Sequence, residues 1–209
     1  MLSLYIVRHG QTEWNTEHRM QGWQDSDLTA EGLRRARALG ERLKHTDFQK
    51  VYISSSKRTE DTAKAILGNR QVPPLEKEDL FREMSLGTWE GKKQEDIEKE
   101  EPERLHAYFH QPTAYQPADG ESFEELEQRV KRALLMLTDR HQSGNVLLVT
   151  HSVFILMMLN IVKKRGISEV WNSSYIHDTS LTLLTIDAAG TITIKKEGDG
   201  EHRESTVSL

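Results

Sequence analysis

The chain has 209 residues, with 28 Lys and Arg against 33 Asp and Glu and no cysteine. This length suits a single domain over residues 1–209, and the lack of cysteine excludes disulfides, thiolate nucleophiles and cysteine-based zinc sites, in keeping with a reducing compartment. A net charge of −5 without a basic stripe argues against a nucleic-acid partner. No apolar run reaches the roughly 20 residues that span a bilayer, so we expect a soluble, cytoplasmic protein.

Two strand–helix units open the chain. Residues 4–7 form a short apolar run that ends at the tripeptide "RHG", which is typical of a strand covered on both faces. The stretch 25–43 follows, where Thr29 can cap a helix whose apolar residues recur at helical spacing. Residues 51–53 predict a second strand, followed by a helix that begins near three serines and stops at Gly68.

The second half of the chain predicts another strand between two helices, and then a hairpin. Ser122 and Glu125 have the spacing of a capping box at the start of a helix. The segment "NVLLVTHS" then runs from a strand into the next helix. Residues 179–187 and 191–197 predict an antiparallel hairpin at the edge of the sheet.

These elements predict a three-layer α/β/α fold with a mostly parallel central sheet, an antiparallel edge strand, and a helical insertion over the carboxyl ends of the strands. We place the insertion at about 84–121, a stretch that contains three prolines and many charges. The last dozen residues are polar, and we expect them to be loosely held.

Two of the predicted strands end in a histidine followed by a small residue. These histidines, His9 and His151, could meet if the strands are neighbours, and ligands gather beyond the carboxyl ends of strands in open α/β sheets. Arg58 falls at the start of the second helix, where a cation is unfavourable unless an anion offsets it. Each observation has a plainer alternative. His9 could be a hydrogen-bonded residue at a capped strand end. Arg58 could form a surface salt bridge with Glu60 or Asp61.

Arg8, Arg58 and the two histidines together suit a tetrahedral dianion, because guanidinium groups match phosphate oxygens. With no cysteine and no serine in a G-x-S-x-G context, a neutral imidazole is the available nucleophile, and we assign this role to His9. Glu83 is a candidate acid for protonating the leaving alkoxide. No P-loop, G-x-G-x-x-G or H-E-x-x-H motif is present, so we expect neither a metal nor a cofactor.

Four segments, "LYIVRHGQTEWN", "SSSKRTEDTA", "LFREMSLGTWEG" and "LLVTHS", resemble the histidine phosphatase superfamily, also called phosphoglycerate mutase-like, in order and spacing. The resemblance covers residues 2 to about 195, and "RMQGWQDSDLT" looks most like the bacterial broad-specificity phosphatases. It implies that His9 becomes phosphorylated and that Glu83 is the proton donor. It also implies a phosphate-binding set with one aromatic residue near the pocket mouth, namely Arg8, Asn15, Gln21, Gly22, Arg58, His151 and Ser152, with Trp23 at the mouth. Four further histidines match nothing catalytic, namely His18, His45, His106 and His110.

The superfamily also includes cofactor-dependent mutases, and the charge of the insertion distinguishes this chain from them. Residues 84–121 hold nine Asp and Glu against four Lys and Arg, so a small trianion should be repelled. Aromatic residues in this stretch either offer apolar contact to a substrate or simply pack, and they are Trp89, Tyr108, Phe109 and Tyr115. We therefore expect a phosphomonoesterase of broad specificity, acting on small molecules as a monomer or homodimer. The alternatives are a phosphoglycerate mutase and a non-catalytic phosphate-ligand binding protein.

Overall fold

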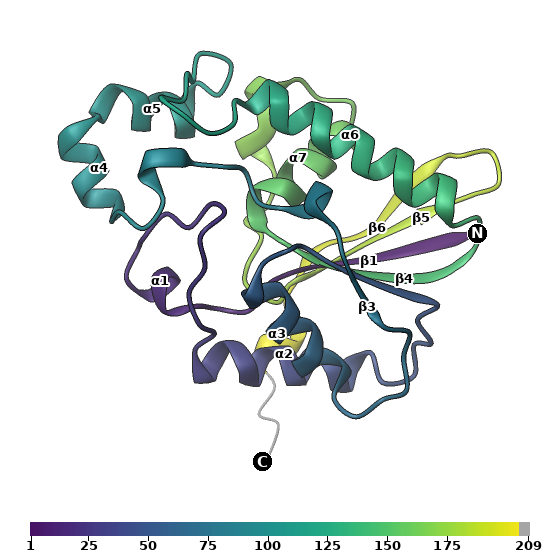
Figure 1. Cartoon of the computed structure of the whole chain (residues 1–209). Helices are drawn as coiled ribbons and strands as arrows, with labels where there is room; N and C mark the ends of the chain where they lie inside the picture. The colour runs from purple at the N-terminus through teal and green to yellow at the C-terminus, as the bar shows by residue number, and fades with distance from the viewer. Residues whose placement is uncertain (205–209) are drawn as a thin grey trace.

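The computed structural model describes residues 1–204, and in this part of the chain a six-stranded sheet lies between helices on both faces (Figure 1). The strand order is β3-β2-β4-β1-β5-β6. In chain order the strands are β1 Leu2–Arg8, β2 Lys50–Ile53, β3 Leu75–Lys77, β4 Gly144–Thr150, β5 Leu181–Ile186 and β6 Ile192–Asp199. The pairs among β3, β2, β4 and β1 are parallel, whereas β5 is antiparallel to both β1 and β6. The expected hairpin at the sheet edge, β5–β6, is confirmed.

Helices cover both faces of the sheet and one end of it (Figure 1). The helices are α1 Glu13–Thr16, α2 Ala30–Arg42, α3 Lys57–Leu67, α4 Gln94–Glu100, α5 Pro102–His110, α6 Phe123–Arg140 and α7 Ser152–Val162. Short 3-10 turns are η1 Asp79–Phe81, η2 Gly87–Trp89, η3 Ile167–Asn172 and η4 Glu201–Arg203. No described helix is long and apolar enough to cross a membrane.

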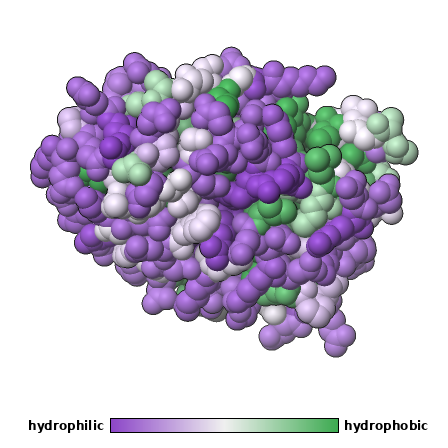
Figure 2. Space-filling model, turned by 45° about the horizontal axis from the view of Figure 1, so that its top comes forward, coloured by the Kyte–Doolittle hydropathy of each residue, from purple (hydrophilic) through white to green (hydrophobic). Residues whose placement is uncertain are grey.

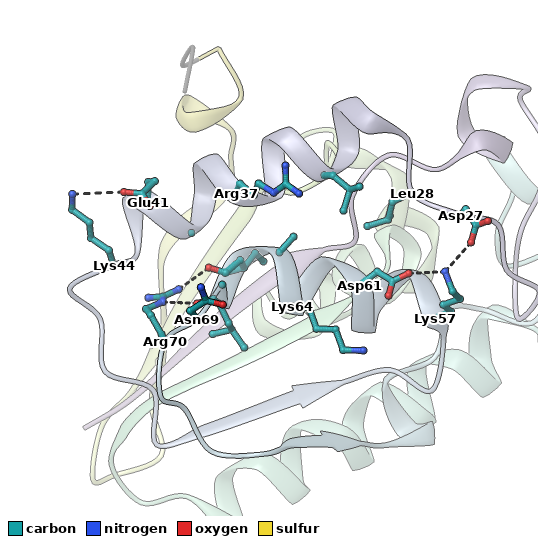
Figure 3. Close-up of a pocket in the computed structure, with 16 residues that line it drawn as sticks. Asp27, Leu28, Arg37, Glu41, Lys44, Lys57, Asp61, Lys64, Asn69 and Arg70 are labelled. Atoms are coloured by element: carbon teal, nitrogen blue, oxygen red, sulfur yellow. Dashed lines mark hydrogen bonds and ion pairs between the residues drawn. The ribbon is translucent and has the colours of Figure 1, made fainter. Parts of the chain in front are cut away.

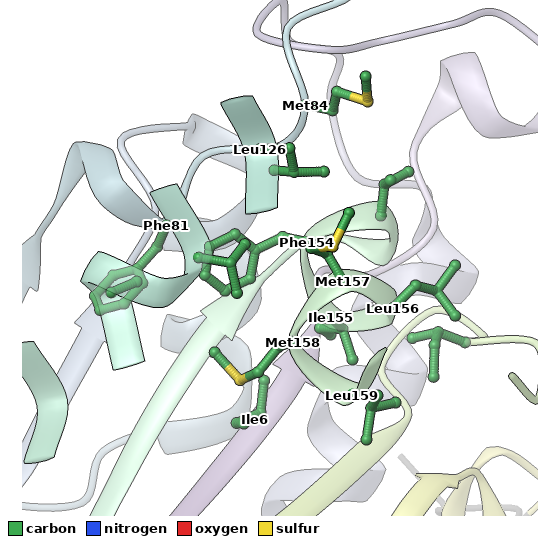
Figure 4. Close-up of a cluster of buried hydrophobic side chains, with 14 of the residues drawn as sticks. Ile6, Phe81, Met84, Leu126, Phe154, Ile155, Leu156, Met157, Met158 and Leu159 are labelled. Atoms are coloured by element: carbon green, nitrogen blue, oxygen red, sulfur yellow. The ribbon is translucent and has the colours of Figure 1, made fainter. Parts of the chain in front are cut away.

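The sheet is buried on both sides because each inner strand alternates apolar residues between two cores. On one side Leu4 and Ile6 of β1 pack into a cluster with α6 and α7, and Met158 of α7 lies beside Ile6 in Figure 4. On the other side Val7 packs into the smaller cluster beneath α2 and α3. This double coverage explains why the inner strands read as continuous apolar runs.

Helix caps determine where the helices that carry site residues begin. Thr29 accepts a hydrogen bond from the N–H of Gly32, as its position predicted, and Ser122 and Glu125 form the expected reciprocal box. Of the three serines that precede α3, Ser56 is the N-cap residue, but its side chain makes no capping hydrogen bond. Asp25, from a distant loop, instead accepts from the N–H of Lys57 at 2.7 Å.

The insertion and the C-terminal segment are both more ordered than plain loops. Helices α4 and α5 stand beyond one end of the sheet, at the left of Figure 1. Residues 198–204 correct the expectation of a loose tail, because β6 continues to Asp199 and His202 in η4 is only 3% exposed. Residues 205–209 lie outside the described part of the chain.

The face shown in Figure 2 is mostly hydrophilic, with apolar side chains gathered toward the right of that view.

Candidate active site

The two histidines meet where β1 and β4 end. These strands are paired in register up to Arg8 and Thr150, and the N–H of His9 donates to the carbonyl of Thr150 at 2.9 Å. Both imidazoles are buried, with ring centroids 5.3 Å apart. The prediction that the strands are neighbours and that their histidines meet is confirmed.

The ring of His9 is held as a neutral imidazole. Its Nδ1 lies 2.8 Å from the carbonyl of Gly10, which can only accept, so Nδ1 carries the proton and Nε2 keeps a lone pair. Burial, and then the positive charges of Arg58 and Arg8, hold the pKa of His9 well below its usual 6.5. The alternative that His9 is a hydrogen-bonded residue at a strand end is thus correct for Nδ1. The same bond leaves the lone pair of Nε2 available for reaction.

Arg58 lies inside the protein rather than on its surface, with 1% of its area exposed. Its terminal nitrogens donate to three groups of the loop 22–25, namely the carbonyls of Gly22 and Gln24 and the carboxylate of Asp25, at 2.5–2.8 Å. The alternative of a surface salt bridge with Glu60 or Asp61 is therefore wrong. Those two carboxylates pair with lysines instead.

His151 is fully occupied within the protein. Its Nδ1 accepts from Arg58 at 3.1 Å, and its Nε2 therefore donates to the hydroxyl of Ser54 at 2.8 Å. Burial and the charge of Arg58 hold the pKa of His151 well below 6.5. A direct contact from His151 to a phosphoryl oxygen would require one of these two bonds to open.

Two buried guanidinium N–H groups beside His9 have no partner among the described residues. They are the Nε groups of Arg8 and Arg58. Arg8 makes one hydrogen bond through NH1, to the carbonyl of Ile176 at 2.7 Å. A buried charged donor without an acceptor is costly, and an anion bound here would supply the missing acceptors.

Glu83 lies over the first turn of α7. Its carboxylate accepts from the N–H groups of Met84, Val153 and Phe154 at 3.0–3.2 Å and from the hydroxyl of Ser152 at 3.3 Å. It lines the same cavity as His9. Its neighbour Glu90, a second carboxylate close in sequence, accepts instead from the N–H groups of Trp23 and Leu86.

The other expected phosphate-binding residues, Asn15, Gln21, Gly22 and Ser152, also line this cavity. Asn15 closes a capping box with Thr12, and the amide of Gln21 donates to the hydroxyl of Thr12 at 2.8 Å. Gly22 has a φ of +52° and turns its carbonyl to Arg58. Trp23 is 46% exposed, and its Nε1 donates to the carbonyl of Glu83.

The cavity has a volume of about 400 Å³. Several of the residues that line it were not predicted from the sequence as site residues. Of the four aromatic residues named above in the insertion, Tyr108 and Phe109 line it, while Trp89 and Tyr115 are buried packing residues. His18, set aside above, also lines the cavity. The remaining unpredicted residues include Met20, Trp171, Tyr175, His177 and Asp178. Met20 falls within the quoted segment "RMQGWQDSDLT", but no quoted motif includes the other four, which come from η3 and from the chain just before β5. No group of three or more His, Cys, Asp or Glu that could hold a metal ion occurs among residues 1–204.

A second and larger hollow, of about 930 Å³, lies between α2 and α3 (Figure 3). Much of its charge is neutralised locally, since Lys57 pairs with Asp27 and Asp61, and Lys44 with Glu41. It contains no histidine, and no orphaned donor points to a ligand there. The smaller cavity is lined by His9 and by Arg8 and Arg58, whose Nε groups find no acceptor among the described residues, and it is therefore the candidate active site.

Comparisons with known proteins identify the family of the chain. The family described as the histidine phosphatase superfamily (branch 1) matches residues 4–198. The solved structure of Bacillus stearothermophilus YhfR superposes with a TM-score of 0.94 at 37% identity, covering 98% of this chain and 100% of that one. Phosphoserine phosphatase 1 of Hydrogenobacter thermophilus is 31% identical over 84% of this chain and 85% of its own length. A probable phosphoglycerate mutase, GpmB of Salmonella arizonae, is 32% identical over 78% of this chain and 75% of its own length.

Proposed function

The chain belongs to the histidine phosphatase superfamily and is a phosphatase, and we propose that it hydrolyses phosphomonoesters through a phosphohistidine formed on His9. The observation that carries this proposal is the pair of buried Nε groups of Arg8 and Arg58, which find no acceptor within residues 1–204 and lie beside a neutral imidazole. Together they provide two fixed donors for phosphoryl oxygens and one lone pair for phosphorus.

The reaction proceeds in two in-line steps. In the first, Nε2 of His9 forms a bond to phosphorus as the ester P–O bond breaks, and protonated Glu83 gives its proton to the departing oxygen. In the second, the Glu83 carboxylate takes a proton from water, whose oxygen displaces His9 and releases inorganic phosphate. Two displacements retain the configuration at phosphorus. No step needs a metal or an added cofactor.

The aromatic residues that line the cavity support the proposal that the substrates are esters with apolar or aromatic groups and that the substrate range is broad. Phe109, Trp171 and Tyr175 supply aromatic surface. Apart from Arg8 and Arg58, Arg19 is the one Lys or Arg among the described residues that line the cavity, and its guanidinium is already engaged by Glu17 and the carbonyl of Gly91. The charge of a second anionic group on a substrate would therefore find little compensation in the cavity. Phosphoglycerate carries such a group, so the mutase reaction is less supported than hydrolysis.

A non-catalytic phosphate-ligand binding protein is less supported for a different reason. A binding protein needs neither a nucleophile with a free lone pair nor a carboxylate over it, and this cavity holds both. We keep three finer points as predictions that rest on the sequence: a cytoplasmic location, a monomer or homodimer, and no nucleic-acid partner.

Trapping the intermediate tests the proposal. Protein mixed with radiolabelled p-nitrophenyl phosphate and quenched in alkali should carry label on His9, since N–P bonds survive base and break in acid. His9→Ala should carry none, while the matched control His106→Ala, an exposed histidine of α5, should label normally. Acid-stable label, or equal label on His9→Ala, would show that another nucleophile reacts.

A further inference from the structure

The segment that carries Glu83 has little regular structure of its own to hold it. Residues 82–86 lie between the 3-10 turns η1 and η2 and join no strand of the sheet. Such backbone needs partners from elsewhere for its polar groups. The position of the Glu83 carboxylate therefore depends on whatever binds this stretch of main chain.

One buried side chain binds three carbonyls at the start of this stretch and just before it. Arg129 projects from α6, and its NH1 donates to the carbonyls of Leu80 and Arg82 at 3.0 and 2.7 Å. Its NH2 donates to the carbonyl of Glu83 itself at 3.0 Å. Three carbonyls along a turn of four residues thus converge on a single guanidinium.

The remaining donors of Arg129 are taken by Glu121. Nε and NH2 of Arg129 meet the two carboxylate oxygens at 2.7 and 2.6 Å, so all five N–H groups of the guanidinium have acceptors. Glu121 also accepts from the N–H of Ser85 at 2.9 Å. The ion pair therefore grips the main chain on both sides of Glu83, and both partners are largely buried.

We propose that Arg129, oriented by Glu121, is a positioning residue for the general acid, holding the Glu83 carboxylate where it can reach the leaving oxygen. This inference rests on the role assigned to Glu83 above. Arg129 touches neither the cavity nor the substrate, and it acts through the main chain. Lysine cannot replace it, since an ammonium has three donors and lacks the planar fork that spans three carbonyls and a carboxylate.

The signature of a misplaced acid is selective loss with poor leaving groups. A positioned acid matters for an alkoxide and little for p-nitrophenolate. In single-turnover measurements, Arg129→Lys should slow phosphorylation of His9 by a simple alkyl phosphate about 10- to 100-fold and by p-nitrophenyl phosphate less than about threefold. Arg132→Lys, an exposed arginine on the same helix, is the matched control and should change neither rate.

A double variant separates positioning from general damage to the fold. In a Glu83→Gln background no acid remains to be positioned, so adding Arg129→Lys should change the alkyl rate by less than about twofold. Equal slowing of both esters by Arg129→Lys, or a full further loss in the double variant, would overturn the proposal. If Arg129→Lys does not fold, Glu121→Gln supplies the same test with a smaller selective loss.

The outcomes also distinguish this inference from the assignment of Glu83. If Glu83→Gln itself slows both esters equally, the acid is another group and the proposed role of Glu83 fails. If Glu83→Gln is selective for the alkyl ester while Arg129→Lys and Glu121→Gln are not, Glu83 is the acid and the positioning role fails alone.

Discussion

Replacing Gly22 with alanine should destabilise the protein and impair catalysis together. Its φ of +52° is left-handed, and a Cβ there would overlap the carboxylate of Glu90. The backbone conformation costs alanine about 1–2 kcal/mol. Glu90 would also have to leave the N–H groups of Trp23 and Leu86, which it accepts at 2.9 and 3.0 Å, at about 1 kcal/mol for each bond. The free energy of unfolding should therefore fall by about 3–4 kcal/mol.

Gly190→Ala is the matched control for the backbone contribution. Gly190 lies in the β5–β6 turn with a φ of +80°, and no described atom lies within 4 Å of its would-be Cβ. It should lose only the left-handed cost, about 1–2 kcal/mol, and keep full activity. Gly22→Ala should also lower kcat/KM, because the Gly22 carbonyl holds Arg58 and Trp23 holds the carbonyl of Glu83.

Urea unfolding of both variants, with assays on p-nitrophenyl phosphate, measures these effects. The contact with Glu90 is isolated by repeating Gly22→Ala in a Glu90→Ala background, where the added cost should shrink to about 1–2 kcal/mol. Equal losses for Gly22→Ala and Gly190→Ala would refute the reasoning from the contact. So would an undiminished loss in the Glu90→Ala background.

Four further predictions concern pH, metal and substrate. Because the pKa of His9 lies well below 6.5, kcat/KM corrected for ionisation of the substrate should show no break near pH 6.5. A break there that persists in the profile of a His151→Asn variant would contradict the assignment. The buried, neutral state of His9 and His151 contributes fully above pH 6.5 and is lost below it, so the free energy of unfolding in urea should fall by up to about 2 kcal/mol per imidazole between pH 7 and 5; no fall in that window refutes this. Activity should persist in excess chelator and be inhibited by orthovanadate, whereas a strict need for added Mg²⁺ would reject the metal-free mechanism. Aryl and larger alkyl monoesters should turn over faster than 3-phosphoglycerate, and rapid conversion of 3- to 2-phosphoglycerate would instead favour the mutase.

The fold was predictable from the sequence wherever the spacing of apolar residues indicated both the type of element and the face of it that is buried. The strand at 4–7 and the helix capped at Thr29 have continuous or periodic apolar residues that only a covered sheet and its helices explain. Strand β3 was missed because it has three residues, none fully buried, and so no period to detect. Turn η4 was missed because its burial comes from one polar residue, His202, whose partner Thr179 is distant in sequence.

Site residues were predictable where they follow a strand or begin a helix, as His9, His151 and Arg58 do. Their supporting partners were not. Asp25 and Arg129 are charged residues in stretches that look like ordinary solvated surface, and only tertiary structure shows that each binds buried groups. Sequence spacing specifies the neighbours of a residue along one element, whereas these contacts join elements far apart in the chain.

The reversed direction of β5 has a consequence for how the substrate range can change. Because β5 runs against β1, the chain approaches it at the edge where the other inner strands end, and it brings Tyr175, His177 and Asp178 to the cavity on the way. This part of the cavity lining is thus encoded in a short stretch separate from the segments that carry His9 and the arginines, whereas Phe109 and Trp171 come from α5 and η3. Its main ties to the rest of the protein are the bond from Arg8 to the Ile176 carbonyl and the ion pairs of Asp178. Laboratory selection confined to residues 173–175 and 177 could therefore redirect the enzyme to new leaving groups while its phosphate chemistry is inherited intact.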